Sequence, residues 1–257
     1  MRARLRRMVK RINTVFLNLW FYPLFVIYTL SAVTVMSLIV ILSFPGTWRV
    51  ALRRFRQAIK VYGNVVIRIL PFPWIRIRLK DHAPQEKGGP YIFVSNHPAA
   101  TDAFLMAVLP GEIVQVVNKW PFKLPILGQF ARWAGYLSVN EMPYEEFFIR
   151  AVRYIQEGVS IVVFPEGTRS SSKAMGQFHG AMFRVALEAK AAIVPVVIWG
   201  NKDIPARGTM ALCPGKISVH KLKAVTFDEY KNMGPFKLKN HIRDLIATEL
   251  EGMTPCA

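Results

Sequence analysis

A run of uncharged residues near the N-terminus constrains this chain more than any other feature of its sequence. Residues 12–48 contain no acidic or basic side chain and no histidine, and their most apolar part, from Phe21 to Phe44, is 24 residues long. About 20 helical residues suffice to cross a hydrocarbon layer of ~30 Å. Trp20 and Trp48 stand near the two ends, where aromatic side chains suit a membrane interface. The run therefore predicts a membrane-associated helical segment.

Three interpretations of this segment compete. A cleaved signal peptide is disfavoured, because the apolar run far exceeds the usual length of a signal-peptide core. A single span would place one basic flank on each side of the membrane, which fits the positive-inside bias poorly. A re-entrant hairpin that turns near Ser31 or Ser37 would return both basic flanks to one face, but backbone breaks inside a membrane are costly. The sequence leaves the single span and the hairpin open.

The basic charge of the chain is concentrated in the same region. The net charge is +18; residues 1–80 hold 15 Lys/Arg and no Asp or Glu, whereas residues 81–257 hold 19 Lys/Arg and 16 Asp/Glu. Residues 49–70 have the pattern of a basic amphipathic helix, which favours anionic lipid headgroups. Nucleic acid is the weaker alternative, because no recognised binding module is present. We therefore predict a membrane-anchoring helical region over residues 1–70, with membrane lipids and no nucleic acid as its partners.

The remainder, residues 71–257, alternates between strand and helix patterns after a break at Pro71-Phe72-Pro73. The predicted strands cover 74–80, 91–94, 113–117, 136–139, 159–164, 193–198, 217–220 and 222–225. The predicted helices cover about 123–134, 143–156, 180–190 and 235–250, preceded by one that starts near Pro98 or Thr101 and ends at Pro110. This alternation predicts an α/β fold with a mostly parallel central sheet flanked by helices. We expect residues 71–257 to form one domain.

A histidine and an aspartate follow the predicted strand 91–94. They are His97 and Asp102, in the segment Ser-Asn-His-Pro-Ala-Ala-Thr-Asp. Active sites in α/β folds gather at the carboxyl ends of strands. A turn at Pro98 would let the Asp102 carboxylate fix one imidazole nitrogen and leave the other free as a base. Because no nucleophile-elbow motif is present, we expect a substrate hydroxyl to attack directly. Taken alone, such a turn is more often structural.

A second polar turn follows the predicted strand 159–164, with the sequence Phe-Pro-Glu-Gly-Thr-Arg-Ser. It holds Glu166, Gly167, Thr168 and Arg169. A guanidinium can bind a phosphate or a carboxylate by a two-pronged contact. The alternative is an internal Glu166–Arg169 pair that holds the loop, and alone that alternative is the better interpretation.

Together the two turns resemble sequence blocks of the glycerolipid acyltransferase family, which includes the 1-acylglycerol-3-phosphate acyltransferases. Asn96-His97 with Asp102 resembles the first block, and residues 164–170 resemble the third. Val194-Pro195-Val196-Val197 is similar to the fourth block, a buried strand with a central proline. The resemblance covers about residues 90–200, and the N-terminal segment also fits it.

The resemblance implies a membrane-bound enzyme of phospholipid biosynthesis. It would move a fatty acyl group from acyl-CoA or acyl carrier protein to the free hydroxyl of a lysophospholipid, with phosphatidate as the expected product from 1-acylglycerol-3-phosphate. His97 would be the base and Asp102 would orient it. Glu166, Gly167, Thr168 and Arg169 would bind the acceptor, with Arg169 on its phosphate. The catalytic domain would lie on the cytoplasmic face, and no cofactor would be needed. A non-catalytic membrane-binding protein with the same fold is the alternative.

One block departs from the family pattern. The segment Gly135–Glu141 aligns with the second block, which usually ends in an arginine that helps to hold the acceptor's phosphate; here Glu141 occupies that place. A carboxylate repels a phosphate monoester. The departure gives weight to another acceptor, such as a lyso-ornithine lipid.

Two further features have plain interpretations. Met175, Phe178, Met182 and Phe183 could line an acyl channel, but at this spacing they are more often core residues. Two cysteines and five histidines without a metal-ligand spacing predict no bound metal.

Overall fold

The computed structural model describes residues 2–42, 48–84, 88–123, 127–138, 140–168, 175–205 and 208–253. The α-helices are α1 (Arg2–Leu42), α2 (Trp48–Asn64), α3 (Asp102–Leu105), α4 (Leu127–Trp133), α5 (Tyr144–Gln156), α6 (Ala181–Ala189), α7 (Phe227–Tyr230) and α8 (Pro235–Gly252). Shorter helical turns are η1 (Val65–Ile69), η2 (Met106–Val108) and η3 (Trp120–Lys123). The strands are β1 (Ile75–Asp81), β2 (Tyr91–Ser95), β3 (Ile113–Gln115), β4 (Ser160–Val163), β5 (Ala192–Trp199) and β6 (Gly215–Lys221).

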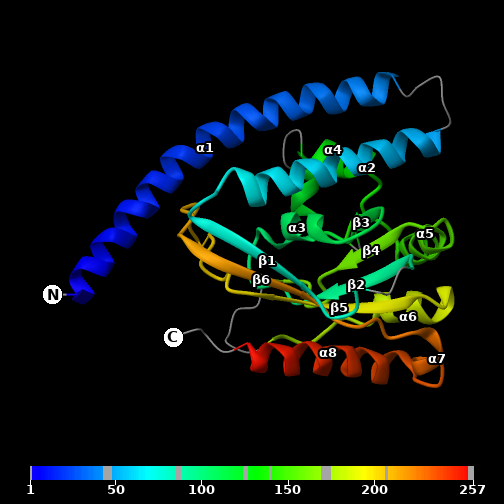
Figure 1. The fold of residues 1–257 in the computed structure, drawn as a ribbon. Helices are drawn as coiled ribbons and strands as arrows, with labels where there is room; N and C mark the ends of the chain where they lie inside the picture. The colour runs from blue at the N-terminus through cyan, green and yellow to red at the C-terminus, as the bar shows by residue number, and fades with distance from the viewer. Residues whose placement is uncertain are drawn as a thin grey trace. The chain divides into compact units, whose positions relative to one another are not determined.

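The strands form one six-stranded sheet in the order β1-β6-β5-β2-β4-β3 (Figure 1). Its centre is parallel: β2 pairs with β5 on one side and with β4 on the other, and β4 pairs with β3. β2 and β4 are buried at every position, as expected for parallel strands covered on both faces. β6 runs antiparallel to β5. The N–H of Leu222 donates to the carbonyl of Pro195, and Gly200 lies beside the carbonyl of Lys216, so the residue numbers fall along one chain segment as they rise along the other. The predicted α/β fold with a mostly parallel sheet is confirmed.

The chain divides into two compact units. The first unit holds residues 1–79, 98–108 and 199–219, and the second holds residues 80–97, 109–198 and 220–257. The N-terminal helices thus group with two short segments from later in the chain. The predicted boundary at residue 70 between an anchoring region and a catalytic domain stays a prediction.

In the first unit, α1 is a single uninterrupted helix. Among the described residues it is the one helix long and apolar enough to cross a membrane, over Arg7–Ile39 with a mean hydropathy of 1.8. Hydroxyl groups along it donate to carbonyls one turn earlier; that of Ser31, for example, donates to Ile27 at 3.0 Å. α1 continues helically through Ser31 and Ser37, so it has no hairpin turn at either position.

α1 packs on α2, which returns alongside it (Figure 1). The ring of Tyr62 stacks on that of Tyr28, with centroids 5.4 Å apart, and its hydroxyl lies 2.9 Å from that of Thr29. The Asn18 amide bonds both the backbone N–H and the carbonyl of Leu212 at 2.9 Å. Side chains of α1 therefore fix it to α2 and to the segment that precedes β6.

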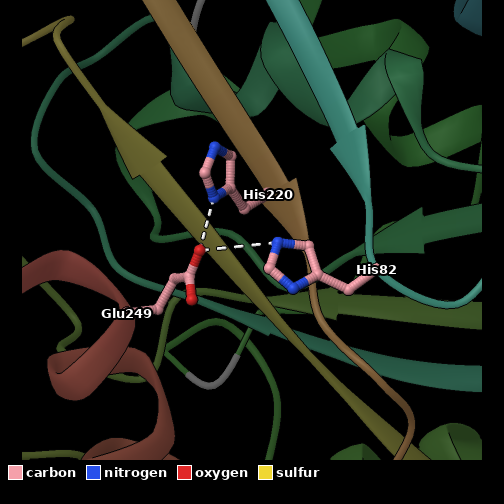
Figure 2. Close-up of side chains that lie close together, drawn as sticks. All are labelled: His82, His220 and Glu249. Carbon is pink, nitrogen blue, oxygen red and sulfur yellow. Dashed lines mark hydrogen bonds and ion pairs between the residues drawn. The ribbon is translucent and has the colours of Figure 1, made fainter. Parts of the chain in front are cut away.

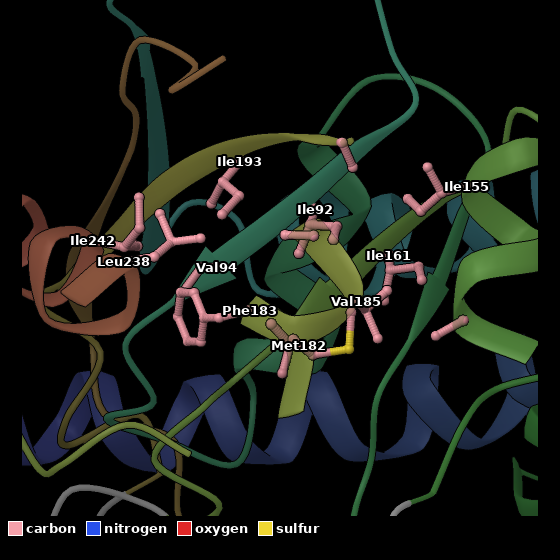
Figure 3. Close-up of a cluster of buried hydrophobic side chains, with 14 of the residues drawn as sticks. Ile92, Val94, Ile155, Ile161, Met182, Phe183, Val185, Ile193, Leu238 and Ile242 are labelled. Atoms are coloured by element: carbon pink, nitrogen blue, oxygen red, sulfur yellow. The ribbon is translucent and has the colours of Figure 1, made fainter. Parts of the chain in front are cut away.

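In the second unit, α5, α6 and α8 supply the apolar side chains that cover one face of the sheet. Figure 3 shows their contacts with Ile92 and Val94 of β2, Ile161 of β4 and Ile193 of β5. α8 contributes Leu238, Ile242 and Ile246, all fully buried and spaced along one helix face. This core fixes the strands from which the candidate site extends.

Some predicted elements differ in the structure. Residues 136–139 form no strand within the part that is described; Leu137 makes a single bridge to Val116, and Val139 lies outside the described residues. Residues 222–225 likewise contribute one bridge, from Val225 to Ile193. Leu137 and Val225 are buried in the core, but the described residues of these two segments continue no ladder.

The methionine and phenylalanine residues near the second turn are core residues, as the plainer interpretation predicted. Phe178, Met182 and Phe183 are buried in the main cluster, and Met175 packs against it.

Candidate functional site

His97 lies two residues beyond β2, at the carboxyl end of the parallel strands. Its imidazole stacks on the ring of Phe164, with centroids 4.6 Å apart and an interplanar angle of 27°. Phe164 directly follows β4, and Val94 pairs with Val163 in the preceding register. The side chain of His97 is half-buried. The sheet therefore brings the end of β4 against the predicted base.

The backbone around His97 is held by two buried polar side chains. The Asn96 amide donates to the carbonyl of Ile198 at 2.9 Å and accepts from its N–H at 2.8 Å. The His97 N–H donates to Oε1 of Glu166 at 3.0 Å. The turn after β2 is thus attached to both neighbouring strands. Asn96 was part of the recognised block, but nothing in the sequence assigned it this role.

Glu166 is buried and turned toward the protein. Its second oxygen, Oε2, accepts the N–H of Gly176 at 2.9 Å, so two backbone donors hold the carboxylate. The third-block glutamate thereby sets the backbone position of the predicted base. Its predicted contact with an acceptor stays a prediction.

The next two residues of the second turn, Gly167 and Thr168, are exposed. Gly167 has φ +68°, and a Cβ at this position would lie 3.0 Å from Nε2 of His179. Both the backbone conformation and the neighbouring imidazole therefore require glycine. Thr168 is exposed, and Arg169 lies outside the described residues.

His179 is a neighbour of this turn that sequence reasoning missed. Its N–H donates to the carbonyl of Pro165 at 2.8 Å, and its exposed imidazole lies beside Gly167. No motif marks His179 in the sequence. Its position beside Gly167 follows from the fold, which brings His179 against Pro165.

Asp102, the first residue of α3, is fully buried in the first unit. Its Oδ2 accepts the N–H of Ala99 at 2.9 Å, and its Oδ1 accepts a short hydrogen bond from the side-chain amide of Asn201. Asn201 is also fully buried and was not predicted. His97 ends a segment of the second unit, so the His97–Asp102 contact stays a prediction from their separation in the sequence.

Glu141 is exposed in the turn that precedes α5. The neighbouring N–H of Asn140 points to the Ser138 hydroxyl at 3.4 Å, which shapes the turn. The carboxylate that replaces the family's arginine is therefore available to solvent.

Comparison with known proteins identifies the same part of the chain. Residues 75–199 match the profile of the family described as Acyltransferase. The chain is 28% identical over 194 residues to a 1-acyl-sn-glycerol-3-phosphate acyltransferase of Limnanthes alba. The aligned region covers 66% of this chain and 69% of the relative. It is 31% identical over 139 residues to a lyso-ornithine lipid O-acyltransferase of Pseudomonas aeruginosa. Here the aligned region covers 52% of this chain and 50% of that protein.

The fold is also found among solved structures. The 1-acyl-sn-glycerophosphate (LPA) acyltransferase PlsC from Thermotoga maritima superposes with a TM-score of 0.77 at 19% sequence identity, over 95% of this chain and 97% of that one. At this identity the match concerns the fold. The chain therefore carries an acyltransferase domain over residues 75–199, and it is an enzyme similar in sequence to the 1-acyl-sn-glycerol-3-phosphate acyltransferases.

Proposed function

We propose that this enzyme is a membrane-bound O-acyltransferase that moves a fatty acyl group from acyl-CoA or acyl carrier protein to the free hydroxyl of a lysophospholipid. The first candidate acceptor is 1-acylglycerol-3-phosphate, which would yield phosphatidate. One observation carries the proposal: His97 is held at the carboxyl end of β2, stacked on Phe164 and anchored through its backbone to Glu166. The names of the curated relatives support the substrate class.

The reaction follows from an imidazole base and a thioester. One nitrogen of His97 takes the proton of the acceptor hydroxyl, and the oxygen attacks the thioester carbonyl. The tetrahedral intermediate collapses, the carbon–sulfur bond breaks, and the imidazolium returns its proton to the departing thiolate. An ester and a free thiol result, and His97 is again neutral. Positioning of the two substrates supplies much of the rate.

The other site residues act on this step through position and charge. The Asp102 carboxylate would hold the second imidazole nitrogen and stabilise the imidazolium. Glu166 keeps the backbone of His97 in place. Gly167, Thr168 and Arg169 would meet the acceptor headgroup, and Arg169 would pair with its phosphate.

The apolar surface of α1 supports the membrane-bound part of the proposal. Leu19 and Leu30 are 69% and 57% exposed, in a helix whose central part lacks charge. Basic side chains before and after this part would meet anionic headgroups. A long-chain acceptor that stays in the membrane could then reach an enzyme held at its surface.

A second acceptor, a lyso-ornithine lipid, is favoured by Glu141. An exposed carboxylate repels a phosphate monoester and attracts the ammonium of an ornithine headgroup. The Pseudomonas relative carries this activity in its name.

Replacing Glu141 with arginine separates these two acceptors. Glu141→Arg should raise the rate on 1-acylglycerol-3-phosphate relative to lyso-ornithine lipid, measured with one acyl donor. Glu145→Arg, a change at another exposed glutamate near the start of α5, is the control and should leave the ratio unchanged. Unchanged relative rates in Glu141→Arg would contradict a selective role for Glu141.

A panel of acceptors tests the function itself. The purified full chain, reconstituted in liposomes, is given one labelled acyl-CoA or acyl carrier protein and a series of lysolipids. The proposal predicts acyl transfer to at least one of them. Liposome binding without transfer to any acceptor from either donor would instead favour the non-catalytic membrane-binding alternative.

A further inference from the structure

Two histidines and a glutamate from distant parts of the sequence meet in the second unit. Figure 2 shows that His82, just after β1, and His220, near the end of β6, both point toward Glu249 in the last turns of α8. Nδ1 of His220 lies 2.5 Å from Oε1 of Glu249, and Nε2 of His82 lies 3.5 Å from the same oxygen. One potential ligand atom from each residue lies within 4.8 Å of the other two.

The strand ends hold the two imidazoles side by side. The His82 N–H donates to the carbonyl of Lys221 at 2.9 Å, and the Lys221 ammonium bonds both oxygens of Asp81 at 2.9 and 3.0 Å. These contacts fix the register of β1 and β6, and the two imidazole centroids lie 5.4 Å apart. The cluster is therefore positioned by contacts that do not use its own ligand atoms.

The core positions the carboxylate. Glu249 lies three residues after Ile246 and seven after Ile242, so it lies close to the same side of α8. Both isoleucines are fully buried. α8 therefore presents Glu249 from a helix that is already fixed against the sheet.

From this geometry we propose that His82, His220 and Glu249 form a binding site for a divalent transition-metal ion, with Zn²⁺ as the best fit. Two imidazole nitrogens and one carboxylate oxygen are a common zinc ligand set. Ligands about 2.0–2.1 Å from a tetrahedral zinc lie roughly 3.3–3.5 Å apart. The His82–Glu249 distance of 3.5 Å already meets this spacing. The fourth position would take water, because His82 is exposed.

Binding requires a small local change. The 2.5 Å contact between His220 and Glu249 is a hydrogen bond, and the metal would replace it. The carboxylate oxygen would withdraw from the imidazole by about 1 Å to reach ligand spacing. Rotation of the Glu249 side chain supplies this movement without any shift of α8.

The charges around the cluster select the class of metal. The cluster itself has one carboxylate, that of Glu249. The nearby Asp81 carboxylate is paired with Lys221, and the positive charge of Lys80 acts on Glu249. Ca²⁺ and Mg²⁺ require several oxygen ligands and are disfavoured. Imidazole suits zinc and its transition-metal neighbours. A bound ion would join β1, β6 and α8, a structural role independent of the proposed acyl transfer.

Zinc titration of the full chain tests the site. The protein is first treated with EDTA, and Zn²⁺ is then measured in competition with a chromophoric chelator. Co²⁺ serves as a second probe, because its visible absorption reports tetrahedral ligation and thiolate ligands add a separate ultraviolet band. We expect one Zn²⁺ per wild-type chain and a rise in the unfolding temperature on binding.

The central variant is His82→Ala, because this side chain is exposed and its removal leaves the core intact. Its Kd for Zn²⁺ should rise at least about tenfold, and zinc should no longer raise its unfolding temperature. Glu249→Gln should act in the same direction. The matched controls are His241→Ala, on the same helix, and the double change Cys213→Ser with Cys256→Ser. Both controls should bind zinc as the wild type does.

Two results would overturn the proposal. One is the absence of stoichiometric zinc binding by the wild type at micromolar concentration, which would leave the cluster as a His220–Glu249 hydrogen bond with His82 beside it. The other is equal zinc affinity in His82→Ala and the wild type, which would assign the ion to a different site.

Discussion

Asp102 is a buried carboxylate, and donors of its own unit bond to both of its oxygens. Within its own unit it accepts hydrogen bonds from the Ala99 N–H and from the Asn201 amide. A buried charge is costly unless donors compensate it. We therefore expect Asn201 to position Asp102, the predicted partner of the proposed base His97.

Removing the Asn201 amide should lower the stability of the protein. Asn201→Ala leaves the Asp102 charge with one donor fewer, and we expect a loss of about 1–3 kcal/mol in the free energy of unfolding, measured with denaturant. Its kcat should fall while KM for the acyl donor changes little. Asn140→Ala, which removes an exposed amide paired with Asn118, is the control and should change the stability by less than about 0.5 kcal/mol. Wild-type stability and kcat in Asn201→Ala would contradict the role given to this amide.

At this scale the sequence predicted the local part of the site. His97 with Asp102, and residues 166–169, could be proposed because each group lies within one short motif, and their roles stay predictions. Asn201 could not be found, because it lies 99 residues from its partner Asp102 and carries no motif. The inward hydrogen bonds of Glu166 were equally hidden, since they depend on where His97 and Gly176 fold.

Secondary-structure elements were predicted well where burial and periodicity agree. β2, β4 and β5 are short apolar strands and appear within a residue or two of their predicted limits. The segments 136–139 and 222–225 also contain apolar residues, but each contributes a single bridge among the described residues, because pairing depends on which neighbours the fold supplies. α4 begins at Leu127, four residues later than predicted, after the short turn η3.

Tyr230 at the end of α7 gives a prediction at the scale of elements. It is fully buried, and its hydroxyl donates to the carbonyl of Ala186 at 3.0 Å and contacts that of Ala191. Tyr230 therefore connects α7 to the end of α6. Tyr230→Phe should cost about 1 kcal/mol of unfolding free energy, because the buried carbonyls of Ala186 and Ala191 lose the donor that the hydroxyl supplies.

The same residue predicts an alkaline dependence of stability. Burial raises the pKa of Tyr230 to about 12 from its ordinary value of 10.0. The folded protein therefore keeps this proton where the unfolded chain has released it, so the contribution to stability is complete below pH 10 and declines as the pH rises toward 12. Denaturant unfolding across this range should show a smaller decline in Tyr230→Phe than in the wild type.

The exposed Tyr144 provides the control for the loss of stability at neutral pH and for the change in the alkaline decline. Tyr144→Phe should keep the stability of the wild type at neutral pH and the same decline above pH 10. Identical alkaline profiles for Tyr230→Phe and the wild type would show that Tyr230 is not the group responsible.

For the whole molecule, the uneven distribution of charge and hydropathy predicted where membrane contact should occur. The sequence left a single span and a hairpin open, and α1 is one helix through both proposed turn positions. The sequence did not predict that residues 98–108 and 199–219 would join the N-terminal helices in one unit. That grouping arises from long-range contacts such as Asn18 with Leu212.

Charging the apolar surface of α1 should release the protein from membranes. Ile27 and Leu30 are both exposed near the middle of the helix. Each arginine placed there costs about 2.5–3.5 kcal/mol of insertion free energy at the centre of a span. Ile27→Arg with Leu30→Arg should therefore reduce co-sedimentation with liposomes severalfold or more, whereas Ile27→Ala with Leu30→Ala should bind nearly as the wild type does. Equal binding by the charged and wild-type proteins would mean that α1 does not enter the lipid.

The most direct test of the central claim compares acyl transfer by the wild type and by His97→Ala, both reconstituted in liposomes with the acceptor and donor that give the highest wild-type rate. The base should contribute about 10²–10⁴-fold, so kcat should fall by that factor while liposome binding and the unfolding temperature stay near wild-type values. His241→Ala, on α8, should retain full activity. Equal rates of transfer by His97→Ala and the wild type would contradict the assignment of His97 as the base of an acyltransferase.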